Sequence, residues 1–562
     1  MSSGHLHAFF IATAVCFPGL LHAEIINQKP DTIKQVLADI KKTEDELLKV
    51  DHLRNDALKR LSIKQHPYPI KKVNVSPNND IQYSLAQKDY LRYPAAKYPA
   101  YFKFDLDQYN TELEFHAWMQ ADQDIFFNAK GVNIYNGLID ITNYNKNTVD
   151  RFWLRRLRPS LEGTLADYFN FMINPDFGQD QAQLFDAFVD INYLRILGLQ
   201  AGLQMSLVSG IENYFDNFSY LSRAYTMEMS NPAMMAPDRE VGLVLHGSLG
   251  PSGDESYYRG LSYLGFDDLF SYQVGLFNGT PDNSSVGVDI SGSNIQFSQV
   301  DSISSSKAIE ARVFINPFIA TAPSVLKHLG IGFAGSYENV ESQGELPALV
   351  SLGQNTIFKI DGLAATAQGP RSRLHPQAVW YSGPLGVLAD WTQTSQQLHT
   401  NFYPTDIPGT FQSNSITQKS QASQIQLIYN ITQEDFNLFH LEPNNNFHPF
   451  ERDSYGAWQI VLRLTGLNMD KNVFNPVVED FYGTSITTYL YADPQASIQK
   501  ANSWSIGVNW YWTMALRFTM EYARTQFTGG NCPSINGTCL QPSAVTNRPV
   551  ENIFMQRFQV SF

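Results

Sequence analysis

The sequence predicts an all-β protein, a transmembrane antiparallel β-barrel of about 16 strands. Three observations lead to this prediction: apolar and polar side chains alternate along most of the chain, aromatic residues are abundant, and no long apolar run follows residue 24. A spanning helix needs about 18 or more consecutive apolar residues, whereas a barrel strand alternates between a lipid face and a polar interior face. A large secreted β-sandwich or solenoid is the less favoured interpretation.

The composition agrees with a barrel. The chain has 562 residues, of which 43% are hydrophobic and 13% aromatic, and its formal net charge is −14. The mean hydropathy of −0.25 is too low for an α-helical membrane protein, but alternating strands have a polar average. The aromatic excess suits girdles at the two membrane interfaces. The acidic balance disfavours nucleic-acid binding.

Residues 1–23 have the features of a secretory signal peptide. An apolar stretch over residues 8–21 has the length of a signal core, and Ala23 is a small residue before the expected cleavage point. Cys16 lies inside this stretch, but it is not preceded by a small residue, so we expect no lipid anchor. The segment predicts export of the mature chain.

Two segments are expected between the signal peptide and the barrel. In residues 24–61, Ile33, Ile40 and Leu47 recur every seven residues, which indicates a short coiled-coil helix in the periplasm. An amphipathic helix packed on its own domain is the alternative. Residues 62–110 are rich in Pro and Tyr and predict an extended linker.

Residues 111–562 are predicted to form the outer-membrane barrel. Alternating segments follow at a mean spacing of about 28 residues, which accommodates a strand of about 10 residues and one connection. An even number of strands places both ends of the barrel on the periplasmic side. The alternating segments lie near residues 113, 153, 165, 184, 197, 241, 270, 308, 329, 373, 385, 424, 457, 503, 515 and 553.

The connections between these segments are predicted to alternate in length. The expected short turns are Glu162-Gly163, Leu194-Arg195, Ser382 to Leu385 and Thr513-Met514. The expected long links, either extracellular or folded inward, are 122–150, 206–238, 279–306, 340–371, 398–420, 467–500 and 527–551.

The 206–238 link is the candidate for a loop that narrows the pore. It holds many aromatic and methionine side chains, which would be costly to leave in water. An ordinary surface loop is the alternative. The residues assigned to the constriction are Tyr214, Phe215, Phe218, Tyr220, Arg223 and Tyr225.

The last segment has the pattern of the closing strand of an outer-membrane barrel. Phe558, Val560 and Phe562 share one face, and the residues between them are polar. We expect these three side chains to be the signal read by the barrel-assembly machinery.

Two cysteines, Cys532 and Cys539, remain after removal of the signal peptide. They lie in a segment rich in Gly, Asn, Pro and Ser, and an oxidising compartment favours a loop disulfide between them. A metal site would need more His or Cys nearby, so we expect neither a metal nor a cofactor.

Charged residues recur at positions predicted to face the interior. An inward arginine draws anions, whereas opposing rows of arginine and carboxylate create a transverse field that filters dipolar solutes. A salt bridge that rigidifies the wall is an equally weighted role for each arginine. The predicted pore-lining residues are Arg156, Arg158, Asp186, Asp190, Glu310, Arg312, Arg463, Arg517, Glu521 and Arg557, with Glu114, Glu240 and Asp390 as further acidic positions.

Several stretches together resemble the phosphate-selective porin O and P family. They are Arg155-Arg156-Leu157-Arg158 followed by Leu161-Glu162-Gly163, then Leu184 to Gly202, then Arg239-Glu240-Val241-Gly242-Leu243, and Gly456-Ala457-Trp458-Gln459 leading to Arg463. The resemblance covers about residues 111–562. It implies a homotrimer of barrels in the outer membrane, each with a basic constriction that attracts phosphate or other anions.

The sequence departs from this family where selectivity would be set. The family usually carries lysines just after the glycine that corresponds to Gly202, whereas Leu203, Gln204 and Met205 follow it here. We therefore expect an outer-membrane porin for passive diffusion of small hydrophilic solutes and ions, embedded in outer-membrane lipid. An anion- or phosphate-selective channel is the alternative.

Two other classes of function have less support. A barrel-anchored envelope-tethering or adhesion protein would use the N-terminal helix or the loops as its active part. An enzyme is disfavoured because the sequence has no HExxH, no GxSxG, no P-loop and no GxGxxG after a strand.

Overall fold

The computed structural model describes the barrel region and omits most of the chain before it. The described residues are 102–106, 111–127, 134–135, 138–139, 150–165, 168–179, 182–211, 227, 230–249, 268–280, 287–291, 294–298, 306–319, 325–343, 346, 348–360, 365–402, 412–438, 441–450, 454–481, 484–531, 534–535, 538–539 and 545–561.

Sixteen of the described strands form the barrel wall. They are β2 (Thr111–Phe126), β5 (Arg151–Leu165), β6 (Phe169–Asp176), β7 (Gln183–Leu194), β8 (Leu197–Met205), β9 (Arg239–Leu249), β10 (Phe270–Phe277), β13 (Ala308–Ile315), β14 (His328–Gln343), β17 (Ala365–Ser382), β18 (Leu385–Phe402), β19 (Gln412–Asn430), β20 (Ala457–Asn468), β23 (Ile498–Tyr511), β24 (Leu516–Asn531) and β28 (Glu551–Ser561).

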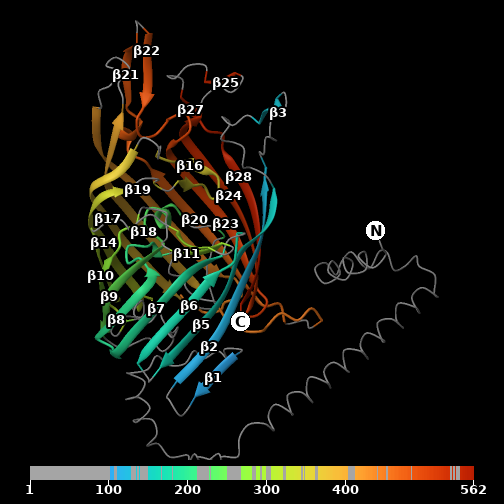
Figure 1. Ribbon diagram of the computed structural model, residues 1–562. Coiled ribbons are helices and arrows are strands. Elements are labelled where there is room, and N and C mark those ends of the chain that lie inside the picture. Colours follow the sequence, from blue (N-terminus) through green and yellow to red (C-terminus); the bar gives the residue numbers. More distant parts are fainter. Residues whose placement is uncertain are drawn as a thin grey trace, which may run out of the picture. The chain divides into compact units, whose positions relative to one another are not determined.

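The wall is a closed antiparallel barrel. Each strand pairs with the next wall strand along the chain, and β28 returns to pair with β2 from Trp118↔Ser561 to Phe126↔Ile553. Closure leaves no unpaired strand edge, which a bilayer demands because lipid offers no partner to backbone polar groups. Figure 1 shows the tilted strands around this barrel.

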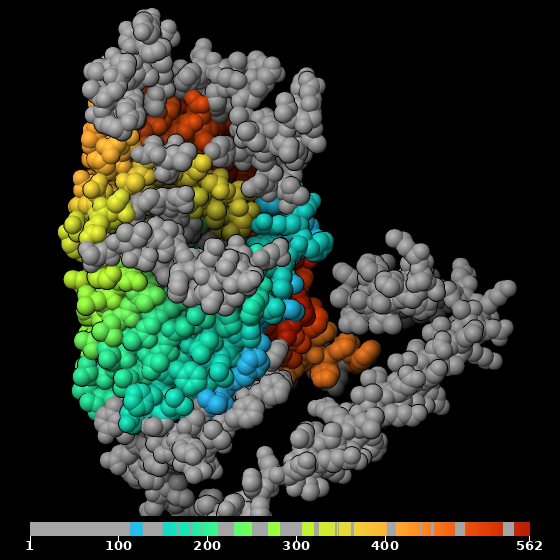
Figure 2. Space-filling view, viewed as in Figure 1, coloured from blue at the N-terminus to red at the C-terminus, as the bar shows by residue number. Residues whose placement is uncertain are grey.

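The two faces of each strand differ as the alternation predicts. On β13, Ile309 and Ile315 are 54% and 42% exposed, whereas Glu310 and Arg312 between them are 0% and 2% exposed. The apolar face therefore points out of the barrel and the charged face points in, which is the reverse of a water-soluble protein. Figure 2 shows the outer face of the green and teal strands as a continuous wall.

Aromatic rings gather on the outer wall at one end of the barrel. Trp458 of β20 stacks on Trp510 of β23 with 5.0 Å between ring centroids, and Trp512 meets Phe558 of β28 at 5.8 Å. Such a belt is typical of a membrane–water interface. It lies at the end where the turn between β23 and β24 reverses the chain, which we call the short-turn end.

Shorter elements lie on or between the connections. They are β1 (Phe102–Leu106), β3 (Ile134–Tyr135), β4 (Leu138–Ile139), α5 (Asn231–Met234), β11 (Gly287–Ser291), β12 (Asn294–Ser298), β15 (Leu349–Val350), β16 (Thr356–Phe358), η6 (Lys471–Phe474), β21 (Pro476–Phe481), β22 (Thr484–Tyr489), β25 (Ser534–Ile535), β26 (Thr538–Cys539) and β27 (Thr546–Asn547). β1 lies within the stretch expected to be a linker, and it pairs with β2.

The predicted strand count is confirmed, although the segments expected near residues 153 and 165 both fall within β5, and β6 begins only at Phe169. The predicted turn at Glu162-Gly163 is wrong. Both residues lie inside β5, where Glu162 pairs with Glu114 on one side and Met172 on the other. A single glycine does not end a strand whose ladder continues on both sides. The reversal comes after Leu165.

The predicted link at 398–420 is also wrong over most of its length. β18 and β19 continue into it, and their ladder includes His399↔Ser415. The strands β17, β18 and β19 have 18, 18 and 19 residues, more than the roughly 10 that a membrane demands. Polar side chains on both faces removed the alternation signal there. The predicted links 122–150, 340–371 and 527–551 were likewise drawn too long. Their ends belong to the neighbouring wall strands.

Two long connections were missed at the short-turn end, and the first of them, residues 250–269, joins β9 to β10. The second, residues 431–456, joins β19 to β20, and its Phe436 and Leu438 are only 5% and 2% exposed. The backbone N–H of Phe436 donates to the carbonyl of Gly383 in the turn between β17 and β18, at 2.7 Å. The segment therefore folds back against the barrel.

Several predicted features fall outside the described residues. They are the signal peptide 1–23, the helix 24–61, Phe562, Cys532 and the side chain of Cys539. Within the described part of the chain, no helix has the length and hydrophobicity to cross a membrane.

Candidate functional site

The connection between β8 and β9 enters the space that the barrel encloses, which we call the lumen. In its described parts, Val208 and Ile211 are 0% exposed and Met227 is 1% exposed. Carboxylates on three separate strands accept hydrogen bonds from its backbone. These bonds run from Leu207 N to Glu310 on β13 (2.7 Å), from Ile211 N to Asp390 on β18 (3.3 Å) and from Met227 N to Glu521 on β24 (2.5 Å).

Three more wall side chains bind this connection. His375 Nδ1 lies 2.9 Å from the carbonyl of Val208, Thr394 Oγ1 donates to the carbonyl of Met235 at 3.0 Å, and Asn231 N donates to Thr465 Oγ1 at 3.3 Å. Because these partners come from β17, β18 and β20, the connection crosses the lumen to the wall opposite β8.

The six side chains assigned to the constriction, Tyr214 to Tyr225, lie outside the described residues. That assignment stays a prediction. The described residues on either side of them lie inside the lumen, so the inward course expected for the 206–238 link agrees with the structure.

All ten predicted pore-lining residues lie on inner strand faces and are at most 4% exposed. Three of the six predicted arginines bond to carboxylates of the wall. The carboxylate bonds are Arg158 Nε to Asp176 (2.6 Å), Arg463 Nη2 to Glu521 (3.3 Å), and Arg557 Nε and Nη2 to Asp122 (2.8 and 2.7 Å). Arg156, Arg312 and Arg517 donate instead to the glutamine side chains of Gln120, Gln273 and Gln559.

Asp186, Asp190 and Asp390 have basic partners as well. Asp186 accepts from Arg239 Nε at 2.6 Å, and Asp190 lies 2.6 Å from His246 Nε2. Asp390 lies 2.9 Å from His375 Nε2. The arginine-to-carboxylate rows expected from the sequence are therefore direct ion pairs within the wall.

Arg239, Arg371, Arg373 and Glu338 were not predicted, although each is at most 4% exposed on the inner face. Arg371 and Arg373 belong to a strand that also contains Pro370 and Pro376, and proline weakens a strand signal. Arg239 is directly followed by inward Glu240, so strict alternation assigned only one of the two to the lumen.

Arg371, Arg373 and Glu338 complete a charged cluster with Glu240 of β9 and Glu310 of β13. Arg371 Nη1 donates to Glu338 at 2.9 Å, and Arg373 Nη1 lies 3.7 Å from the same carboxylate. Glu240 accepts from the N–H of Gly279 at 3.1 Å. The cluster mixes both signs of charge, so it does not form a purely basic ring.

A second arrangement brings two arginines onto one ring. The guanidinium carbons of Arg158 and Arg239 lie 3.6 Å and 4.2 Å from the ring centroid of Phe185. Both guanidiniums also bond to aspartates, so the cation–π contacts fix their planes while the carboxylates offset their charge.

Apolar side chains also occupy the lumen. At the short-turn end, Phe436 and Leu438 of the 431–456 connection cluster with Ile211 of the inward connection and with inward wall residues such as Val379 and Leu388. Apolar groups inside a pore impede water and ions, because they offer no hydrogen bonds.

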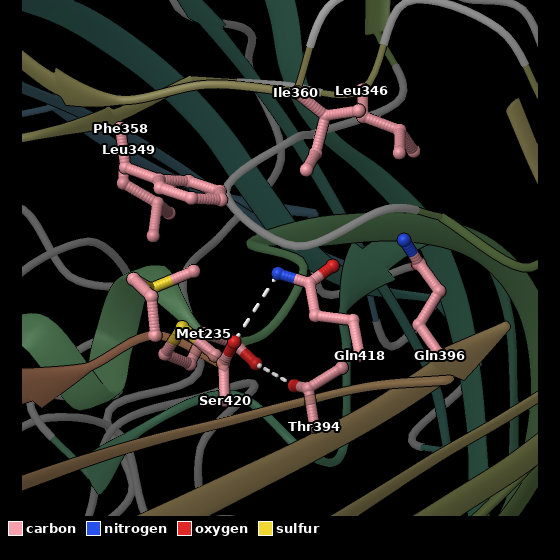
Figure 3. A pocket seen from close by; sticks show the side chains of 10 residues that line it. Met235, Leu346, Leu349, Phe358, Ile360, Thr394, Gln396, Gln418 and Ser420 are labelled. Carbon is pink, nitrogen blue, oxygen red and sulfur yellow. Dashed lines mark hydrogen bonds between the residues drawn. The ribbon is translucent and has the colours of Figure 1, made fainter. Parts of the chain in front are cut away.

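A larger apolar cluster lies further from the short-turn end. Met234 and Met235 pack there with Leu349 and Phe358 from the connection between β14 and β17, and with Met469 after β20. Figure 3 shows part of this cluster facing Thr394, Gln396, Gln418 and Ser420 of β18 and β19 across a small cavity. The cavity has a volume of about 40 Å³.

Among the described residues, no group of three or more His, Cys, Asp or Glu side chains is arranged to hold a metal ion. The lumen therefore offers ion pairs, amides, hydroxyls and apolar surfaces as its chemical groups.

Residues 293–529 match the family model described as phosphate-selective porin O and P. The family resemblance drawn from the sequence is thereby confirmed over this stretch. No curated protein matches the chain.

Solved structures of outer-membrane channels are similar in fold. The outer membrane channel DcaP of Acinetobacter baumannii is 12% identical over 82% of this chain and 99% of that chain, with a TM-score of 0.43. An anion-selective porin from Comamonas acidovorans is 11% identical over 80% and 100%, with a TM-score of 0.42. A trimer form of OmpT from Vibrio cholerae is 8% identical over 80% and 99%, with a TM-score of 0.40.

Proposed function

We propose, from the family match over residues 293–529 and the closed barrel, that this outer-membrane porin is a weakly selective diffusion channel for small hydrophilic solutes and ions. The observation that supports weak selectivity is the pairing of charges in the lumen. Four inward arginines bond to wall carboxylates: Arg158, Arg239, Arg371 and Arg557. A paired arginine attracts an anion less than an isolated one, because its partner cancels most of its field at a distance.

The residues after Gly202 also support this proposal. The family usually carries lysines there, but Met205 joins the apolar cluster at the short-turn end and Gln204 donates to the carbonyl of Gly242 at 3.0 Å. Gly202 itself has a φ of +133°, and a Cβ on it would lie 2.3 Å from the carbonyl oxygen of Ala187. This chain therefore has the glycine of the family pattern at Gly202, but not the lysines that usually follow it.

The inward connection sets the width of the channel in this proposal. Its backbone is held by Glu310, Asp390 and Glu521 from three directions, so its position is fixed by the wall. The unassigned part between Ile211 and Met227 carries the aromatic side chains predicted to form the constriction.

The assembly and orientation are part of the proposal. We assign the short-turn end to the periplasm because the turns of bacterial barrels are short on that side. We assign a homotrimer from the family resemblance, and assembly by the barrel-assembly machinery from the Phe558 pattern. The helix 24–61 would then lie in the periplasm, where it could tether the envelope as a second role. The family and fold favour a channel over an enzyme.

Planar-bilayer recordings test the proposal. The purified protein should give stepwise conductance, with a reversal potential near zero in a potassium chloride gradient. A large reversal potential of the anion-selective sign, together with block by low concentrations of phosphate, would replace weak selectivity with the anion-selective alternative. Absence of conductance would reject the channel itself.

A further inference from the structure

The inner faces of β18 and β19 form a track of hydrogen-bonding groups, of which only Asp390 and Thr394 take part in the contacts above. Asp390 does so through its Oδ2, to His375 and to the N–H of Ile211. Its cross-strand pairs, in order toward the short-turn end, are Gln396↔Gln418, Thr394↔Ser420, Thr392↔Ala422 and Asp390↔Gln424. Apart from Asp390, every polar member is a neutral amide or hydroxyl. Each polar side chain on the track is at most 8% exposed.

Three adjacent polar atoms on this track have no hydrogen-bond partner in the described structure. They are the hydroxyl of Thr392, Oδ1 of Asp390 and Nε2 of Gln424. The set comprises one carboxylate acceptor, one amide donor and one hydroxyl that does either. Buried polar atoms rarely remain unsatisfied, so they indicate a bound partner such as water or a solute group.

The wall opposite the upper part of the track is apolar. Figure 3 shows Leu349 and Phe358 on one side of the cavity, with Gln418 and Ser420 on the other. Met235 lies between them, and its carbonyl accepts from Thr394. The cavity therefore has one hydrogen-bonding side and one apolar side.

We propose that the β18–β19 track and the apolar residues Met235, Leu349 and Phe358 form a subsite for neutral organic solutes that carry hydroxyl groups and one apolar face. A hydroxyl both donates and accepts, so it satisfies the carboxylate oxygen and the amide nitrogen together. An anion would meet Oδ1 of Asp390, the oxygen that neither His375 nor Ile211 contacts, and two negatively charged oxygens at close range repel each other. This inference rests on the proposed channel function and names its solute class.

The size of the cavity sets a condition on this subsite. A volume of about 40 Å³ holds little more than one water molecule, so a solute must displace a side chain. Met235 suits this role because methionine is unbranched and adapts to irregular space. The subsite then opens as the solute enters between the inward connection and the wall.

Current block in planar bilayers tests the subsite with three probes on the wild-type channel. Phenyl β-D-glucoside has hydroxyls and an apolar ring, glucose lacks the ring, and phenyl phosphate replaces the hydroxyls with negative charge. We expect phenyl β-D-glucoside to block at a concentration about tenfold lower than either of the others. Equal block by all three, or stronger block by phenyl phosphate, overturns the inference.

Substitutions locate the block. Thr392→Val removes only a hydroxyl without a described partner, and it should raise the half-blocking concentration of phenyl β-D-glucoside by about fivefold, the equivalent of one hydrogen bond. Phe358→Ala should raise it at least as much. Thr417→Val is the matched control, because Thr417 lies exposed on the outer face of β19.

The outcomes separate the two proposals. Conductance with no selective block rejects the subsite and retains the channel, whereas a wild-type protein without conductance rejects the channel. An unchanged block in Thr392→Val shows that water alone satisfies the three atoms, and it rejects the subsite. The wild-type probe series decides the question if a variant fails to assemble.

Discussion

At the scale of single residues, the lumen is organised by charge pairs whose geometry is specific. Arg557 and Asp122 meet through two parallel bonds of 2.8 and 2.7 Å, and they belong to the last and first wall strands. Paired donors of this kind fix orientation as well as distance. The pair therefore joins the two strands that close the barrel by side chains in addition to the backbone ladder.

Arg557→Leu should lower the free energy of unfolding by about 2 kcal/mol, since it leaves the buried carboxylate of Asp122 without its donors. The midpoint of heat-induced mobility change on gels, followed in detergent, measures this effect. The double variant Arg557→Leu with Asp122→Leu should recover most of the loss. If the double variant is as unstable as the two single losses added together, the pair does not act as a unit.

A second prediction at this scale concerns the carboxylates that hold the inward connection. Glu310→Ala removes the acceptor of Leu207 N, and Glu521→Ala removes that of Met227 N. The double variant should have a larger and noisier single-channel conductance, because two of the three carboxylates that bind the connection are lost. Glu341→Ala, an exposed carboxylate on β14, is the control. Unaltered conductance in the double variant would mean that other contacts position the connection.

At the scale of elements, the 431–456 connection is unusual because it reaches both sides of the wall. Phe436 enters the lumen and lies 5.6 Å from the ring of Tyr381, while Phe447 packs on Trp510 of the outer belt at 4.8 Å. Phe450 beyond it is 98% exposed. One connection thus links an apolar cluster in the lumen to the aromatic belt at the membrane interface.

Phe436→Ala should destabilise the barrel by about 3 kcal/mol, the typical loss for a buried phenylalanine, and should also increase conductance by removing an apolar obstruction. Phe450→Ala is a matched control with the same change in side chain, and its exposed ring predicts an effect within about 0.5 kcal/mol. Heat-induced gel mobility and bilayer recordings measure the two effects. Equal behaviour of the two variants would show that Phe436 contributes no packing.

The strands also show which parts of the fold can be predicted from the sequence. The alternation located every wall strand except β6, because a barrel in lipid imposes the period of two wherever strands cross the apolar layer. It failed where that layer ends: the upper part of β19, with Ser415 and Thr417, is polar on its outer face and was assigned to a loop. The inner charges at Arg312 and Glu310 followed from the same alternation.

What alternation lacked was long-range information. It gave the inward side of Glu521, but not its bond to Met227, which is 294 residues away in the chain. Likewise, Phe436 reads as an ordinary loop residue until the turn between β17 and β18 is placed beside it. Pairing partners and inward folds depend on closure of the whole barrel, so they are properties of the tertiary structure.

At the scale of the whole molecule, the barrel closes without the segment before it. The ladder between β2 and β28 uses residues from Trp118 onward on the first strand, and β1 adds only a short ladder below it. Contacts within the chain also divide it into one unit over Met1–Asn79 and another over Asp80–Phe562. The barrel therefore has the contacts for independent stability.

A chain that keeps the signal peptide but lacks residues 24–101 should still assemble in the outer membrane and conduct. Its heat-modifiable gel band and single-channel conductance should equal those of the full chain, because the closing ladder and the inward connection are intact. Loss of envelope attachment with normal conductance would assign a tethering role to the removed segment. A deleted chain that fails to give the heat-modifiable band would mean that barrel closure needs this segment, and the division of the chain into separate units would then be wrong.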